Sequence, residues 1–249
     1  MFWRLRTLAF YTIISIFMVS FFVLFCTPMQ LLKAPYAFRY KVSEVFSYIF
    51  IYLIWFICGI KYKVEGEGIL PKDGKPYLAL ANHQSFWENF FMQLIIPKHS
   101  WVIKKELEAI PIFGWGIRTV QPIAVDRNNS RSVAQILREG SKKIDAGLSL
   151  VMFPEATRVK VDKNVKFKAS AAKLAINTKT PIVLIAHNAG LVWPKGFWFK
   201  RSGTISVKII EYIPEEKVAA QDARELTLYI QETINQEKSK LVELGVSLF

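Results

Sequence analysis

The sequence predicts an α/β protein whose sheet is covered by helices on both faces, preceded by an N-terminal membrane-embedded helical hairpin. Two apolar runs occupy the first 60 residues, and after them six short strand-like segments alternate with helical ones. Strands that are apolar almost throughout and alternate with helices are typical of a sheet with both faces covered. We therefore expect an anchoring hairpin in residues 1–60 and an α/β domain in residues 61–249.

The composition favours a membrane surface over other locations. Hydrophobic residues make up 52% of the 249 residues, yet the net charge is +13. Each basic residue near an anionic membrane face is favourable by about 1 kcal/mol. Nucleic-acid binding, the other explanation of this charge, fits poorly with the apolar content and with the lack of a nucleic-acid-binding motif. Cys26 and Cys58 lie in apolar segments without C-x-x-C spacing, so neither a disulfide framework nor a zinc site is indicated.

The two N-terminal runs differ in length. Thr7–Thr27 has 21 residues without a charge, enough to cross the hydrocarbon core as a helix. No A-x-A-like cleavage site follows it, so a retained anchor is favoured over a signal peptide. Val45–Ile60 has 16 residues, which is short for a span, so it is expected to lie tilted, re-entrant or half-embedded. Pro28 and Pro35 between them indicate a hairpin, and basic residues on both flanks leave its topology open.

After residue 60, six segments rich in β-branched or aromatic residues are predicted to be strands. They are residues 77–81, 100–103, 122–125, 148–153, 181–186 and 204–210. Helical periodicity and capping residues predict helices over residues 85–96, 130–146 and 168–177, and a C-terminal helix within residues 219–244.

A histidine follows the first predicted strand. His83 stands five residues before Glu88, and Ser85 and Glu88 have the S-x-x-E spacing of a capping box. Five residues of helix turn through about 500°, so His83 and Glu88 can meet only if His83 lies in the turn and Glu88 in the first helical turn. The cap predicts that arrangement. A carboxylate there would fix the tautomer of a histidine acting as general base, although the stretch also makes sense as a plain helix start.

Cations follow three other predicted strands. Arg158, in the stretch Phe153–Lys160, carries a guanidinium suited to phosphate, although an internal ion pair with Glu155 is equally compatible with the sequence. Arg127 comes after one further strand, and Lys104 and Lys105 follow another. Because ligands of α/β sheets bind beyond the carboxyl ends of the strands, this layout is the one expected for a phosphorylated substrate beside His83.

Taken together, four blocks resemble the glycerolipid acyltransferases, and within them the bacterial enzymes that acylate 1-acyl-glycerol-3-phosphate. The resemblance covers residues 60–212. Its blocks are His83 and Glu88 in an H-x-x-x-x-E motif, Ala124–Arg127 in the place of F-I-D-R, Glu155–Arg158 in the place of E-G-T-R, and Pro181–Val183 in the place of V-P-I-V.

The resemblance implies a mixed sheet and a reaction that makes phosphatidic acid. His83, oriented by Glu88, would deprotonate the 2-hydroxyl of lysophosphatidic acid, which would attack an acyl-CoA or acyl-carrier-protein thioester. Other implied roles are phosphate binding by Lys105, Arg127 and Arg158 and substrate binding or bracing by Asn82, Glu155 and Thr157. Neither metal nor cofactor is implied beyond the acyl co-substrate. The expected location is the bacterial inner membrane, with residues 61–249 as the catalytic domain on the cytoplasmic side.

The sequence departs from the family pattern in places. Ala156 replaces the usual glycine, which suggests that a positive φ is not needed there. Glu88 stands where aspartate is more frequent. Alternatives are a different lyso-lipid acceptor or an inactive membrane-binding module of the same fold. Among the other histidines, we expect His99 to be solvated in a loop and His187 to be a structural or rim residue at a strand end.

Overall fold

The computed structural model describes the whole chain except residues 1, 127, 128, 130, 197–200 and 247–249. The described residues form a seven-stranded sheet in the order β1-β7-β6-β2-β5-β3-β4. All neighbouring strands are parallel except β6 and β7, which are antiparallel, so the predicted mixed sheet is confirmed. The strands are β1 Ile60–Glu65, β2 Leu78–Ala81, β3 His99–Lys104, β4 Ile123–Val125, β5 Ser149–Met152, β6 Ile182–His187 and β7 Gly203–Ile213.

The three central strands determine where a site can form. Every residue of β2, β5 and β6 is buried, as expected for strands covered on both faces. Since β2 is parallel to both β5 and β6, the three strands end at the same edge of the sheet. The segments that follow them, which start at residues 82, 153 and 188, therefore meet there.

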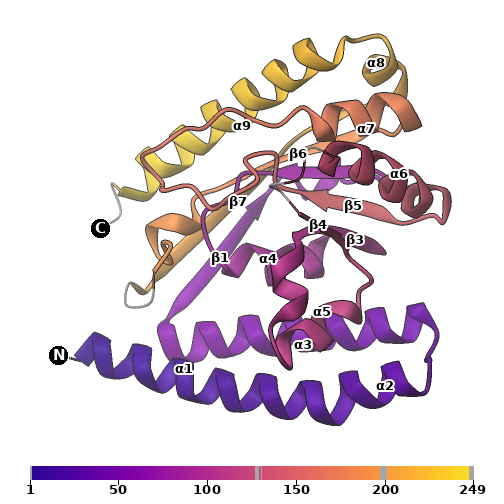
Figure 1. The fold of residues 1–249 in the computed structure, drawn as a ribbon. Coiled ribbons are helices and arrows are strands. Elements are labelled where there is room, and N and C mark those ends of the chain that lie inside the picture. The colour runs from indigo at the N-terminus through magenta and orange to yellow at the C-terminus, as the bar shows by residue number, and fades with distance from the viewer. Residues whose placement is uncertain (1, 127–128, 130, 197–200, 247–249) are drawn as a thin grey trace.

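Two layers of helices cover the sheet (Figure 1). On one face Leu78, Leu80 and Leu150 pack with apolar residues of α6 (Ser132–Asp145), α7 (Ser170–Thr178) and α9 (Ala223–Val246). On the other face Ala79 and Ala81 pack toward α4 (Trp87–Ile95) and the N-terminal helices. The remaining α-helices in the described part of this domain are α5, Phe113–Arg118, and α8, Glu215–Ala219.

The hairpin consists of α1 (Phe2–Phe21), a π-helical turn (Phe22–Cys26), α2 (Thr27–Leu31) and α3 (Tyr36–Cys58). It lies along the base of the domain instead of projecting from it (Figure 1). The second helix is longer than the predicted 16-residue run, because it already starts at Tyr36. Tilted phenylalanine pairs join it to the domain, with the Phe50 and Phe90 ring centroids 3.8 Å apart.

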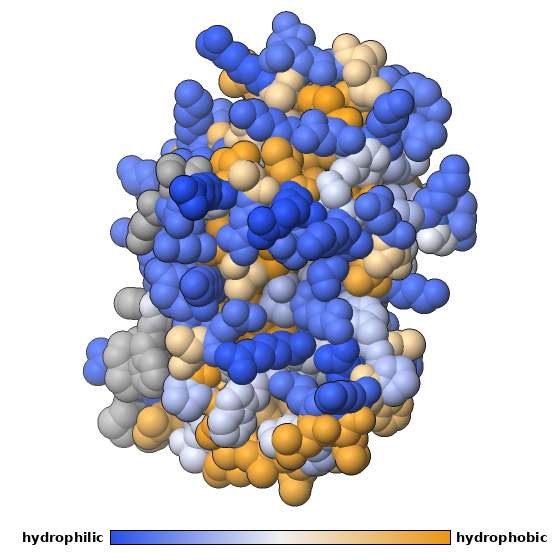
Figure 2. Space-filling model, turned by 45° about the vertical axis from the view of Figure 1, so that its right-hand side comes forward, coloured by the Kyte–Doolittle hydropathy of each residue, from blue (hydrophilic) through white to orange (hydrophobic). Residues whose placement is uncertain are grey.

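Much of the hairpin surface is apolar and exposed. Two helical stretches, Arg4–Leu31 and Tyr36–Cys58, are long and apolar enough to cross a membrane by length and composition. Only 22% and 33% of their apolar windows are buried in the protein, so they differ from core helices. Figure 2 shows hydrophobic side chains gathered at this end of the molecule, while the face above it is mostly hydrophilic with smaller hydrophobic patches. The exposed side chains include Leu5, Leu8, Ile13, Ile16, Val19, Leu24, Tyr52, Trp55 and Phe56.

Candidate active site

His83 and Glu88 are in contact as the sequence predicts. His83 lies in the turn between β2 and α4, and Glu88 lies in the first turn of α4. The distance from His83 Nδ1 to Glu88 Oε1 is 2.5 Å. The Glu88 side chain is fully buried, whereas that of His83 is 15% exposed. The buried carboxylate therefore holds one edge of the imidazole, while part of the ring stays accessible.

The same carboxylate caps the helix. Glu88 Oε2 accepts the backbone N–H of Ser85 at 2.8 Å, which is one half of the predicted capping box. Glu88 Oε1 also accepts the N–H of Gln84 at 2.9 Å. The Ser85 hydroxyl accepts the N–H of Trp87 at 3.2 Å, one residue earlier than in a standard box. Capping and histidine pairing therefore depend on one side chain.

Burial controls the ionisation of Glu88. It raises the pKa of the carboxyl to about 7, against the opposing influence of His187, of two backbone N–H groups and of Arg158. The ionised form is the one that accepts hydrogen bonds from all its neighbours at once. With Nδ1 of His83 directed at this carboxylate, the ring's Nε2 is the nitrogen on the other side. The His83 ring also stacks on Phe153, with centroids 4.2 Å apart.

Glu155 contacts the backbone of His83. Its Oε2 accepts the His83 N–H at 2.9 Å, and burial raises the pKa of this carboxyl to about 7. In the described part of the chain, Glu155 has no ion pair with Arg158, which was the alternative left open by the sequence. The carboxylate thus lies beneath the histidine, where a bracing residue would be.

The expectation for Ala156 is wrong. Its φ is +57°, in the left-handed region that glycine adopts readily. Ala156 closes a tight turn after β5 in which its N–H donates to the carbonyl of Phe153 at 2.9 Å. The turn needs a positive φ whichever residue occupies it. The alanine at this position is therefore strained, and its presence does not mean that a positive φ is unnecessary.

Lys238 reaches this region from the C-terminal helix α9. It is only 2% exposed, and its ammonium donates to the carbonyl of Lys163 at 3.0 Å and to Oδ1 of Asn164 at 2.5 Å. Burial lowers the pKa of Lys238, while Glu155 opposes that shift. A buried cation therefore holds the loop that follows Arg158, and its charge partly balances Glu155.

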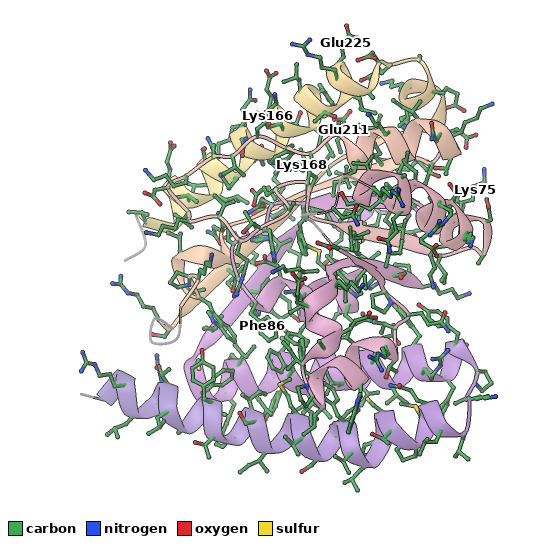
Figure 3. The ribbon with its side chains drawn as sticks, in the orientation of Figure 1. Lys75, Phe86, Lys166, Lys168, Glu211 and Glu225 are labelled. Carbon is green, nitrogen blue, oxygen red and sulfur yellow. The ribbon has the colours of Figure 1, made fainter. Side chains whose placement is uncertain are left out.

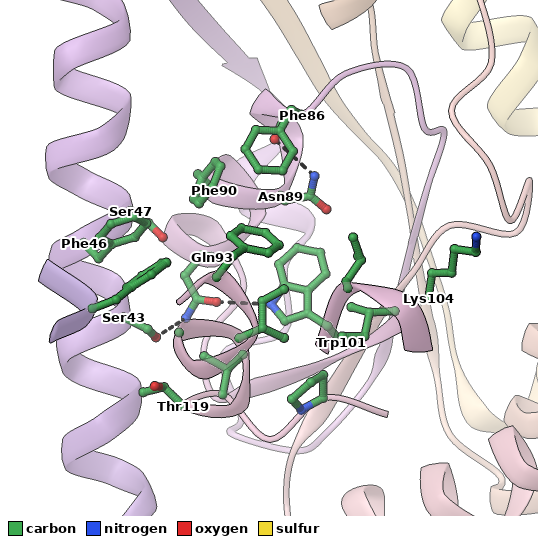
Figure 4. Close-up of a pocket in the computed structure, with 18 of the residues that line it drawn as sticks. Ser43, Phe46, Ser47, Phe86, Asn89, Phe90, Gln93, Trp101, Lys104 and Thr119 are labelled. Carbon is green, nitrogen blue, oxygen red and sulfur yellow. Dashed lines mark hydrogen bonds between the residues drawn. The ribbon is translucent and has the colours of Figure 1, made fainter. Parts of the chain in front are cut away.

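A cavity of about 490 Å³ adjoins His83. Its walls come from α3, α4, β3, α5 and the first part of the hairpin, and they are mainly aromatic and aliphatic. Figure 4 shows the polar contacts within this wall, where Trp101 Nε1 donates to Gln93 and Gln93 donates to Ser43. The apolar lining includes Phe21, Phe22, Phe46, Phe86, Phe90, Trp101, Ile103, Phe113, Ile117 and Val120.

Among the described residues, three cations line the same cavity: Lys104, Arg158 and Lys195. Lys105, which the sequence places in the phosphate site, is exposed and is not among the lining residues, whereas its neighbour Lys104 is. Arg127 lies outside the described residues. Thr157 lines the cavity.

Asn82 does not line the cavity; it is fully buried behind His83. The structure therefore brings His83, Glu88, Glu155, Thr157 and Arg158 together. Sequence reasoning pointed to Lys104 together with Lys105 but missed Lys195 and Lys238. Within the described residues, no group of three or more metal-ligating side chains is present.

The expectation for His99 is also wrong. It is fully buried and starts β3, and burial lowers its pKa to about 4. Its Nδ1 lies 2.9 Å from the hydroxyl of Tyr40 and 2.6 Å from the carbonyl of Ile96. The Tyr36 hydroxyl donates to the carbonyl of His99 at 2.9 Å. His99 thus links α3 of the hairpin to the sheet, a role that no local signal in the sequence indicates.

Comparison with known proteins agrees with this geometry. Residues 61–188 match the family model described as Acyltransferase. The chain therefore belongs to the acyltransferase family and is an O-acyltransferase. It is 36% identical over 208 residues to the 1-acyl-sn-glycerol-3-phosphate acyltransferase of Pseudomonas aeruginosa, covering 82% of this chain and 79% of that one.

A yeast relative and a solved structure are also similar. The 1-acyl-sn-glycerol-3-phosphate acyltransferase of Saccharomyces cerevisiae is 30% identical over 204 residues, which are 80% of this chain but only 65% of the yeast protein. The crystal structure of the 1-acyl-sn-glycerophosphate (LPA) acyltransferase PlsC from Thermotoga maritima aligns with a TM-score of 0.76. The alignment covers 95% of each chain, with 25% sequence identity.

Proposed function

We propose that the protein transfers an acyl chain to the 2-hydroxyl of 1-acyl-glycerol-3-phosphate and so makes phosphatidic acid. One observation supports this most: His83, paired with a buried carboxylate, adjoins an apolar cavity that Arg158, Lys104 and Lys195 also line. A base, an apolar space and phosphate-binding cations are the features that a lipid phosphate acceptor requires. The names of the relatives above point to the same acceptor.

In this mechanism His83 Nε2 takes the proton of the substrate's 2-hydroxyl while Nδ1–H stays bonded to Glu88. The oxygen attacks the thioester carbonyl, the C–S bond breaks, and the thiolate takes the proton back from His83. Pairing with Glu88 stabilises the intermediate imidazolium. A positioned base of this kind typically contributes about 10²–10⁴ in rate. Arg158 and Lys104 would bind the acceptor phosphate, with Lys105 and Arg127 as further candidates from the sequence.

The cavity would hold an acyl chain. Its largely aromatic lining matches an apolar ligand. The acyl donor would be an acyl-CoA or an acyl-carrier protein, both of which are anionic. Exposed lysines follow Arg158 along the loop that runs beside α9, away from the hairpin; Figure 3 labels Lys166 and Lys168 of this loop. Their position suits a donor that arrives from the aqueous side.

The hairpin of residues 1–60 would hold the catalytic domain, residues 61–249, at the membrane that contains the acceptor. Two apolar helices with exposed sides support membrane association. We propose the bacterial inner membrane, with the catalytic domain on its cytoplasmic side, where acyl-CoA and acyl-carrier protein are available.

An assay of the purified full-length protein tests the proposal. It combines a panel of lyso-acceptors with acyl-CoA and with acyl-carrier protein, and compares the native chain with His83→Ala. We expect acylation of lysophosphatidate by the native chain and a loss of about 10²-fold or more in the variant. Preference for an acceptor without a phosphate, or near-normal transfer by His83→Ala, would overturn the proposal.

A further inference from the structure

A second histidine lies behind Glu88. His187 ends β6 and is fully buried, and its Nε2 is 3.6 Å from Glu88 Oε2. The other carboxylate oxygen, Oε1, is the one that contacts His83. One buried carboxylate therefore lies between two histidines, of which only His83 lines the cavity.

The hydrogen bonds of His187 define its tautomer. The N–H of Ala189 points at His187 Nδ1 at 3.3 Å, so Nδ1 is an acceptor and carries no proton. Burial lowers the pKa of His187, which favours the neutral ring. The proton of the neutral ring is then on Nε2, which lies 2.8 Å from the carbonyl of Asn82.

His187 also fixes the residue before His83. The Asn82 side chain donates to the His187 carbonyl and accepts the His187 N–H, each at 2.9 Å. With the ring contact at 2.8 Å, three hydrogen bonds join the end of β2 to the end of β6. The backbone from which His83 projects is thus attached to the residue that contacts Glu88.

We propose that His187 is a positioning residue for the reaction: its Nε2–H donates to the Asn82 carbonyl, the same ring edge lies 3.6 Å from Glu88 Oε2, and together with Asn82 it holds the His83–Glu88 pair in its catalytic arrangement. The proposal rests on the function proposed above. At 3.6 Å the contact with Oε2 is longer than a hydrogen bond, so its influence on the carboxylate is electrostatic. In a fully buried site such an influence is much stronger than in water.

Three further charged or titratable side chains act on the Glu88 carboxylate in the described part of the chain. His83 from the turn after β2 and Arg158 from the loop after β5 stabilise a negative charge on Glu88. Glu155, from the same loop, is the nearby acid that interacts with Glu88 unfavourably. Removing the Nε2–H of His187 therefore leaves the Glu88 anion with fewer stabilising neighbours and makes Glu88 easier to protonate.

Two variants and a control test this role in the full-length protein. His187→Phe removes the N–H and retains a buried ring, whereas His187→Gln retains an N–H donor. His99→Phe is the matched control, because His99 is equally buried but contacts Tyr40 and Ile96 instead of Glu88. Thermal unfolding of each variant separates loss of fold from loss of chemistry.

For His187→Phe we expect kcat with lysophosphatidate and acyl-CoA to fall about 10- to 100-fold, with both KM values nearly unchanged. The acid limb of the kcat–pH profile should move to higher pH, because Glu88 must be ionised to hold His83. His187→Gln should recover much of kcat, and His99→Phe should leave the acid limb in place. An unmoved limb in His187→Phe, or a loss equal to that of His99→Phe, would mean that His187 only packs.

A measurement on the native chain keeps the proposal testable if His187→Phe does not fold. Nitrogen-15 NMR of labelled histidines should show His187 protonated at Nε2 and unprotonated at Nδ1. The opposite tautomer would overturn the proposal. The spectrum and the acyl-transfer assay fail independently. A chain that never acylates lysophosphatidate refutes the proposed function, whereas the tautomer in the spectrum tests the arrangement around His187.

Discussion

Glu155 accepts the backbone N–H of His83 at 2.9 Å, so the loop after β5 is attached to the base itself and not only to its side-chain partner. The attachment has a second point, because the N–H of Val159 donates to the carbonyl of His83 at 2.7 Å. The H-x-x-x-x-E turn and the loop that carries Arg158 are therefore one rigid unit. A substitution in either segment should therefore alter the position of the other.

The first prediction concerns the pH dependence of stability. Burial raises the pKa of Glu155 to about 7 from an ordinary 4.5. The resulting stabilisation is complete below about pH 4.5 and is lost as the pH rises through about 7. Glu155→Gln keeps an oxygen for the His83 N–H and removes this titration. Relative to the native chain, the variant should gain about 1 kcal/mol in the free energy of unfolding between pH 6 and pH 8.5.

Urea unfolding at several pH values measures this difference. Glu243→Gln changes an exposed acid of α9 and serves as the control, which should show no such gain. Comparing each variant with the native chain also cancels the opposite contribution of the buried histidines, whose lowered pKa values favour folding at higher pH. A difference that stays flat across the range would contradict the prediction, because it would show that Glu155 does not change its ionisation between pH 6 and pH 8.5.

The second prediction separates two neighbouring lysines. Lys104 lines the cavity with Arg158, whereas Lys105 does not. Lys104→Ala and Arg158→Ala should each raise the KM for a phosphorylated acceptor by about tenfold, since each removes a charge-assisted contact. Lys105→Ala, the matched control, should change it little. Steady-state kinetics with varied lysophosphatidate decide the matter, and a larger effect from Lys105 would place the phosphate outside the cavity.

The third prediction concerns the strained turn at Ala156. Because its φ of +57° costs an alanine about 1–2 kcal/mol and a glycine little, Ala156→Gly should stabilise the fold by about 1 kcal/mol after the entropy of the unfolded glycine is counted. Ala134→Gly is the control: Ala134 is exposed within α6 and has no positive φ, so glycine relieves nothing there and should destabilise. Thermal unfolding compares the two. Equal destabilisation by both would show that the turn relaxes in solution.

The fourth prediction concerns the seam between α5 and the hairpin. A Cβ on Gly116 would meet ring carbons of Phe22 at 2.5–2.8 Å. Gly116→Ala should therefore cost about 1–3 kcal/mol by overpacking and reduce acyl transfer, because both residues line the cavity. Adding Phe22→Leu should restore part of the loss. Gly68→Ala is the control and should leave stability unchanged, because a Cβ there meets nothing within 4 Å. If Gly116→Ala changed neither stability nor acyl transfer, the contact between α5 and Phe22 would be looser than in this structure.

Local signals predicted most of the fold. The central strands are apolar except for Ser149 at the start of β5 and His187 at the end of β6, and such runs are recognisable without tertiary information. Several short elements were missed, among them β1, α5 and α8. The strand β1, Ile60–Glu65, contains two lysines and is mostly exposed at the sheet edge, so it lacks an apolar pattern. The short helix α5 contains Gly114 and Gly116, which have low helix propensity.

The site was predictable where it is local. The His83–Glu88 contact follows from the five-residue spacing and the cap, both of which can be seen in one stretch of sequence. The contacts of His187 with Asn82 and of Lys238 with Asn164 join residues 105 and 74 positions apart. They depend on which strands become neighbours and on where α9 packs, and no pattern of residue types encodes that.

The cavity beside His83 takes one of its walls from the hairpin, through Phe21, Phe46 and Ser47 among others. The same helices carry the exposed apolar side chains at the base of the molecule. The anchor is therefore part of the reaction chamber and not a tether attached to it. A chain without its first 60 residues would have a cavity open on one side. Such a truncation would make the protein more soluble, but the cavity would no longer enclose the acyl chain.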